Sequence, residues 1–220
     1  MNTMIKKTAF IMATSCALIS FTHAGENEKL AGFYIGGQVG ESKTDLSNSE
    51  ILTVIAGADS TVNNLSLDKE ATLLSIFAGY HINEQFSFEL GYLDLGNRDM
   101  FLSVDTLDKN ALLNRAEEIY PETGEGIMAS VAYHYSITDK WNASAKVGLF
   151  SWEQTFNLNN TAVNTGNALG SDKRDGNSIT FAGEIGYQWQ EDVELFTEFM
   201  VVELDKQDVQ NISVGIRFSL

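Results

Sequence analysis

Apolar residues alternate with small or polar residues, at a period of two, in eight separate runs from residue 31 onward. The runs cover residues 32–40, 72–82, 86–95, 127–136, 141–152, 178–189, 193–204 and 211–220. A period of two is that of a β-strand, in which successive side chains point to opposite faces of the sheet. Each run is about as long as a tilted strand that crosses a bilayer core. The alternation therefore predicts an all-β protein with eight strands.

The connections between these runs also alternate, in this case by length. Segments of three or four residues join the second run to the third, the fourth to the fifth and the sixth to the seventh. Long segments occupy about residues 41–71, 96–126 and 153–177, and only the short link before the last run departs from the alternation. Short turns at one end and long loops at the other are typical of an antiparallel up-and-down transmembrane barrel. We expect one domain over residues 25–220.

The charged residues in the strand centres all fall on the small, polar face of the alternation. An eight-stranded barrel has an interior just wide enough for side chains to fill. Unpaired charges in that interior would cost several kcal/mol per ion. We therefore interpret these residues as an interior polar network that plugs the barrel, with a conducting gate as the alternative. They are Glu89, Lys146, Glu184, Glu198 and Arg217.

The aromatic residues decide which face of the barrel is the outer one. A water-soluble barrel would turn its apolar face inward, whereas a membrane barrel turns it toward lipid. Six tyrosines and tryptophans lie on the apolar face beside the short turns, which a soluble barrel does not require. They predict an aromatic girdle at one membrane interface, formed by Tyr80, Tyr133, Tyr135, Trp141, Tyr187 and Trp189.

The N-terminus has the features of a cleaved export signal. Lys6 and Lys7 precede an apolar run at residues 9–21, and small residues follow up to Ala24. The run is shorter than the roughly 20 residues that a membrane-spanning helix needs, so we expect residues 1–24 to be a secretory signal peptide. Its removal would take away the single cysteine, Cys16, and change the net charge from −16 to −18 by the loss of two lysines. So acidic a chain is a poor candidate for binding nucleic acid.

The last run predicts closure of the barrel, because a strand that ends the chain would otherwise be an exposed edge. We expect it to pair with residues 32–40. Its residues Ser213, Gly215, Phe218 and Leu220 resemble the C-terminal signal read by the outer-membrane assembly machinery, with Leu where that signal usually has Phe.

The segments AGFYIGGQVG, AGYHINEQFSFELGYLDLG and WNASAKVGLFSW resemble the small OmpA-like and OmpX-like outer-membrane barrels of Gram-negative bacteria. The resemblance implies an exported, multi-pass barrel in the cell outer membrane, in contact with membrane lipid and lipopolysaccharide. In OmpA, inward Glu residues on the third and sixth strands pair with Arg and Lys in a proposed gate. Glu89 and Glu184 match those strands, whereas Lys146 and Arg217 lie on the fifth and eighth.

Other candidate sites are weaker. His134 and Ser136 resemble the His-x-Ser pair of PagL-type lipid A deacylases, but they lie at the short-turn end, away from the outer leaflet. His81 and His134 face inward near one another without further metal ligands. Asp172, Asp175 and Asn177 depart from the pattern of a calcium loop and suggest a solvated turn. We expect no catalytic residue, metal or cofactor.

Function is expected in the long loops. The first contains an apolar stretch, residues 51–57, and the second contains a predicted short helix at residues 108–119 that Pro121 ends. The first hypothesis is cell-surface interaction of the adhesion or colonisation type, with a host or matrix ligand. The second is a structural or low-conductance barrel that supports envelope integrity. A lipid A-modifying enzyme is the third.

Overall fold

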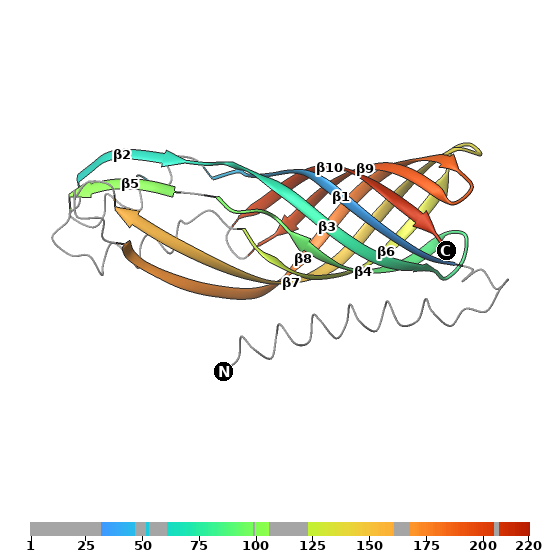
Figure 1. The fold of residues 1–220 in the computed structure, drawn as a ribbon, viewed down its shortest axis with the longest axis horizontal. Helices are drawn as coiled ribbons and strands as arrows, with labels where there is room; N and C mark the ends of the chain where they lie inside the picture. Colours follow the sequence, from blue (N-terminus) through green and yellow to red (C-terminus); the bar gives the residue numbers. More distant parts are fainter. Residues whose placement is uncertain are drawn as a thin grey trace. The chain divides into compact units, whose positions relative to one another are not determined.

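The computed structural model describes residues 32–46, 52, 61–98, 100–105, 123–160, 168–204 and 207–220. These residues form one sheet (Figure 1). Its ten strands are β1 (Phe33–Thr44), β2 (Thr61–Leu67), β3 (Glu70–His81), β4 (Phe86–Asp94), β5 (Met100–Asp105), β6 (Glu125–Ser136), β7 (Trp141–Asn160), β8 (Ala168–Gln190), β9 (Val193–Glu203) and β10 (Asp208–Ser219).

Eight of the strands close into a barrel. The ring runs in the order β7, β6, β4, β3, β1, β10, β9 and β8, and β8 pairs with β7 again. All the pairings within the ring are antiparallel, and β10 pairs with β1 from Tyr34–Ser219 to Thr44–Val209. The predicted fold class is therefore confirmed, and the last strand is not an edge.

The faces of the barrel are inverted relative to those of a water-soluble protein. Large apolar side chains point outward, and the side chains of Leu149 and Val214 are 64% and 61% exposed. The neighbouring residues along the same strands, Phe150 and Ser213, are buried in the interior. An apolar outer surface is what a barrel surrounded by lipid requires.

The interior is more apolar than the sequence alternation suggested. A cluster of buried apolar side chains fills the half of the barrel nearer the long connections. A second, aromatic cluster of Tyr34, Phe77 and Phe196 lies among the charged residues. The reason is volume, since a narrow barrel has to be filled by side chains whatever their polarity. The first cluster contains Leu73, Leu93, Leu95, Met128, Phe150, Trp152, Met200, Val202, Leu204 and Val209.

Strands continue into segments that the sequence suggested were loops. β7 and β8 remain paired as far as Asn159 and Ala168, well past the ends of their other neighbours, β6 at Glu125 and β9 at Glu203. β2 and β5 form an additional antiparallel pair, and β5 also touches β7. Figure 1 shows β2, β5 and the tips of β7 and β8 together at the left end of the barrel. The stretch of residues 171–178, which we expected to be a turn, is part of β8.

Several predictions lie outside the described residues. They are the signal peptide at residues 1–24, the helix at residues 108–119 and, except for the exposed Leu52, the apolar stretch at residues 51–57. Among the residues that are described, we find no helix with the length and hydropathy of a membrane span.

Candidate functional site

The five charged residues predicted for the interior come together at one place inside the barrel. Each lies on a different strand, since β4, β7, β8, β9 and β10 each contribute one, and each is at most 8% exposed. The antiparallel alternation turns all five inward. They are Glu89, Lys146, Glu184, Glu198 and Arg217.

Lys146 is the centre of this group, because its ammonium contacts three carboxylates. Its Nζ atom lies 2.7 Å from Glu184 Oε2, 3.0 Å from Glu198 Oε2 and 3.1 Å from Glu89 Oε2. Three acceptors match the three N–H donors of an ammonium group. Lys146 therefore ties β7 to three other strands of the barrel.

Arg217 holds a second group of carboxylates. Its Nη2 atom lies 3.0 Å from Glu184 Oε2 and 3.4 Å from Glu89 Oε1, and its Nη1 atom lies 2.8 Å from Glu194 Oε1. Glu194 was not among the predicted residues. Glu194 lies on the same face of β9 as Glu198, so the alternation of the strand could have identified it. The sequence prediction covered only charged residues in the strand centres, and Glu194 is the second residue of β9.

The aromatic cluster surrounds both cations. Lys146 Nζ lies 5.7 Å from the ring centroids of Phe77 and Phe196, and Arg217 Cζ lies 4.9 Å from the centroid of Phe196 and 5.2 Å from that of Tyr34. Cations placed over aromatic faces gain favourable electrostatic energy where water is excluded. The rings therefore fill the space between the charged groups and stabilise the cations.

Neutral donors complete the network from β1. Tyr34 Oη lies 2.9 Å from Glu89 Oε1 and Gln38 donates from Nε2 to Glu198 Oε1 at 3.0 Å. Both residues share the inward parity of β1, so the alternation contains the signal for them. The pairing of each with a particular carboxylate depends on how the barrel closes.

His134 bonds to a different serine from the one that the sequence suggested. Its Nε2 atom lies 2.8 Å from Ser87 Oγ on the neighbouring strand β4, whereas Ser136 is exposed. Ser87 is fully buried and also lies 2.9 Å from Tyr34 Oη. The rings of His81 and His134 are 5.2 Å apart. The described residues contain no group of His, Cys, Asp and Glu side chains arranged to hold a metal ion.

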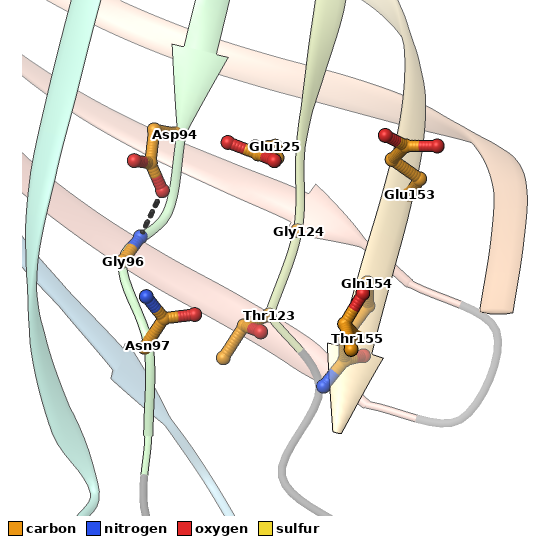
Figure 2. A pocket seen from close by; sticks show the side chains of 9 residues that line it. All are labelled: Asp94, Gly96, Asn97, Thr123, Gly124, Glu125, Glu153, Gln154 and Thr155. Atoms are coloured by element: carbon orange, nitrogen blue, oxygen red, sulfur yellow. Dashed lines mark hydrogen bonds between the residues drawn. The ribbon is translucent and has the colours of Figure 1, made fainter. Parts of the chain in front are cut away.

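A pocket at the long-connection end is lined by acidic side chains that the sequence analysis did not identify. Asp94, Glu125 and Glu153 are directly opposite one another on β4, β6 and β7, and Asp175 on β8 continues the row. Figure 2 shows Asp94, Glu125 and Glu153 on three adjacent strands, with Asp94 accepting a hydrogen bond from the backbone of Gly96. Each acid has the outward parity of its strand. Neither Asp175 nor Asn177 lies in a loop, since both are paired with β7.

The structure places the predicted girdle residues on the outer surface near the short turns. Trp141 and Tyr187 are paired across β7 and β8, and their ring centroids are 4.9 Å apart. Five of the six side chains are more than 40% exposed, and Tyr187 is half-buried. The six are Tyr80, Tyr133, Tyr135, Trp141, Tyr187 and Trp189.

Two residues of the predicted assembly signal have a packing role in the barrel. Ser213 donates to Gln38 Oε1 at 3.1 Å, and a Cβ added to Gly215 would lie 2.3 Å from the ring of Phe196. Phe218 points outward, 41% exposed, and Leu220 follows the end of β10. The packing of the interior therefore constrains Ser213 and Gly215, independently of any role in recognition by the assembly machinery.

Comparisons with known proteins agree with this architecture. The OmpA-like transmembrane domain family matches residues 28–214. A search of curated protein sequences gives no match. The N-terminal β-barrel domain of OprF from Pseudomonas aeruginosa is similar in structure, with a TM-score of 0.50 and 10% identity over 85% of this chain and 96% of that one. Neisserial surface protein A gives a TM-score of 0.51 and 14% identity over 86% of this chain and 98% of that one.

Proposed function

The chain belongs to the family of OmpA-like transmembrane domains and is an outer-membrane β-barrel, and on this premise we propose that it acts in cell-surface interaction of the adhesion or colonisation type. The part that would bind a host or matrix ligand is the sheet formed by β2, β5 and the ends of β7 and β8. We call this sheet the loop-end sheet.

The observation that carries the proposal is the length of β7 and β8. Their pairing continues from Gln154–Arg174 to Asn159–Ala168 at positions where β6 and β9 no longer accompany them. A barrel that only spans the membrane has no need of a hairpin longer than its neighbours. A paired hairpin has a fixed backbone, which lowers the entropy cost of binding relative to an unstructured loop.

Deletion of the hairpin tip tests the proposal. Gln154 and Arg174 are a cross-strand pair, so residues 155–173 can be replaced by Asn-Gly, a dipeptide that favours a two-residue hairpin turn. We expect bacteria that display the shortened barrel to lose binding to host cells or matrix proteins. The matched control replaces the turn at residues 138–140, at the opposite end of the barrel, and should bind as the parent does.

A folding check makes the result interpretable. Each variant should migrate differently before and after boiling on a denaturing gel, as a closed barrel does. If the shortened barrel folds and binds as well as the parent, the loop-end sheet is not the binding surface. If the parent does not bind host cells or matrix proteins, the adhesion-type role itself is wrong.

The filled interior favours a second candidate, a structural barrel that supports the envelope with little or no conductance. The charged network and the apolar cluster both occupy the space that a channel would need. Planar-bilayer recordings should then show no stable open state. A steady, ion-selective current would instead favour the gate alternative.

We propose contacts with membrane lipid, lipopolysaccharide and the outer-membrane assembly machinery on the grounds of the apolar outer face, the girdle residues and the C-terminal residues. We further propose that the protein is not an enzyme. The support is that the hydroxyl beside His134 belongs to Ser87, which is fully buried and cannot meet a substrate. Lipid A from cells that express the parent or Ser136→Ala should have the same acyl composition.

A further inference from the structure

The charged network inside the barrel contains more negative than positive groups. Among the described residues, four carboxylates and two cations contact one another there. Three of the carboxylates are at most 4% exposed and the fourth, Glu194, is 14% exposed. A buried charge without a counter-charge is expensive, because water cannot solvate it. The network therefore needs a further positive charge.

The contacts show where that charge is missing. Glu89 and Glu184 each contact both cations, whereas Glu198 contacts Lys146 alone and Glu194 contacts Arg217 alone. Glu198 also receives a hydrogen bond from Gln38. Glu194 shares its one cation with two other carboxylates. Glu198 shares Lys146 in the same way, and Asn142 is a hydrogen-bonding partner of Glu194 as Gln38 is of Glu198. What distinguishes Glu194 is its exposure to solvent, 14% against at most 4% for the other three.

The position of Glu194 also gives it access to water. It is the second residue of β9, next to a short turn, and the other three carboxylates lie deeper in their strands. A carboxylate at the end of a strand can exchange a proton with the solvent, whereas Lys146 and its three carboxylate partners are buried away from water. Protonation forms one O–H bond and breaks none within the protein.

We propose that the folded barrel binds a proton that the unfolded chain does not hold at neutral to mildly alkaline pH, and that Glu194 carries it. The proton reduces the excess negative charge of the network by one. It is a feature of the folded barrel, because it exists only where closure brings the four carboxylates together.

Other ionisable side chains face the network and have to be separated from Glu194 in any test. Every strand of the barrel contributes at least one. Unfolded histidine is mostly neutral above about pH 7.5, and tyrosine and lysine, with ordinary pKa values of about 10 and 10.4, stay mostly protonated below about pH 9. The range from pH 7.5 to about pH 9 therefore isolates a carboxyl group that ionises late. The groups are Tyr34 (β1), His81 (β3), Glu89 (β4), His134 (β6), Lys146 (β7), Glu184 (β8), Glu194 and Glu198 (β9) and Arg217 (β10).

The experiment is equilibrium unfolding by urea of the purified protein in lipid vesicles, at fixed ionic strength, from pH 7.5 to about pH 9. Since the folded state would hold one more proton than the unfolded state, stability falls as the pH rises. The folding equilibrium constant should decrease by up to tenfold per pH unit. Glu194→Gln, which keeps the shape but cannot ionise, should be nearly independent of pH over this range.

The control is Glu191→Gln, an exposed carboxylate in the neighbouring turn, which should keep the pH dependence of the parent. If Glu194→Gln does not fold, the pH series of the parent alone still decides whether a proton is bound. A parent whose stability does not change with pH overturns the proposal. So does a stability that depends on the concentration of sodium ions and not on pH, because a bound cation would then supply the charge.

Discussion

Lys146 Nζ lies 2.7 Å from Glu184 Oε2, and both side chains are at most 6% exposed. The two residues stand on adjacent strands, β7 and β8, whose backbones are also hydrogen-bonded. A buried ion pair contributes little net stability when compared with an apolar replacement, but the loss of one partner leaves the other charge uncompensated. Lys146 has three such partners, so its removal should be more harmful than that of any one carboxylate.

Lys146→Met should destabilise the barrel by about 3–5 kcal/mol, because three buried carboxylates lose their shared cation. Urea unfolding in lipid vesicles measures the change. Lys140→Met, at the exposed turn before β7, removes the same charge from a solvated site and should change stability by less than about 0.5 kcal/mol. If the two variants were equally stable, the interior ion pairs would not hold the barrel together.

Val214→Lys should destabilise the folded barrel by about 2–4 kcal/mol, because it places a charge on the lipid face near the middle of β10. The cost depends on depth. Gln210→Lys lies on the same outward face of the same strand but nearer to the long-connection end, and should cost at most about 1 kcal/mol. The same unfolding assay compares them. If both variants lost the same free energy of unfolding, residues 210 and 214 would not lie at different depths in the membrane, in contrast to what their places along β10 predict.

Gly79→Ala should weaken the barrel, because a Cβ at this position would lie 2.2 Å from the Tyr34 ring. Tyr34 is almost fully buried and bonded to Ser87 and Glu89, so it cannot move without breaking those contacts. Overpacking of this kind costs about 1–3 kcal/mol. Gly183→Ala is the matched control, since its Cβ would have nothing within 4 Å. It should be neutral or slightly stabilising, and a loss as large as that of Gly79→Ala would contradict the assigned faces.

Phe150→Ala should cost about 3–5 kcal/mol, because it leaves a cavity in the interior apolar cluster. Leu149→Ala changes the adjacent residue, whose side chain is 64% exposed on the outer face. Lipid can fill the space that this leucine leaves, so we expect a much smaller loss. Thermal unfolding followed by gel mobility would show the difference. A greater loss of stability in Leu149→Ala than in Phe150→Ala would mean that the inner and outer faces of β7 are assigned the wrong way round.

The fold could be predicted from the sequence because each of its main features is local. Alternation sets which residues face lipid, so Leu149 and Val214 could be placed outside and Glu89 and Arg217 inside before any pairing was known. The short turns fixed neighbouring strands as antiparallel. The extension of β7 and β8 could not be predicted in the same way. Residues 153–177 are rich in polar and small residues, and such a segment becomes a strand only when a partner strand supplies its hydrogen bonds.

The sequence by itself determined the number of strands that close the barrel, their faces and the residues that enter the interior. These depend on a period of two along the chain, which no distant contact can alter. Only the tertiary structure decided which interior residues meet. His134 contacts Ser87 rather than Ser136, and Arg217 reaches Glu184, Glu89 and Glu194 on three different strands. Such contacts depend on the stagger with which the strands close into a ring, and stagger is a property of the whole ring that no single strand encodes.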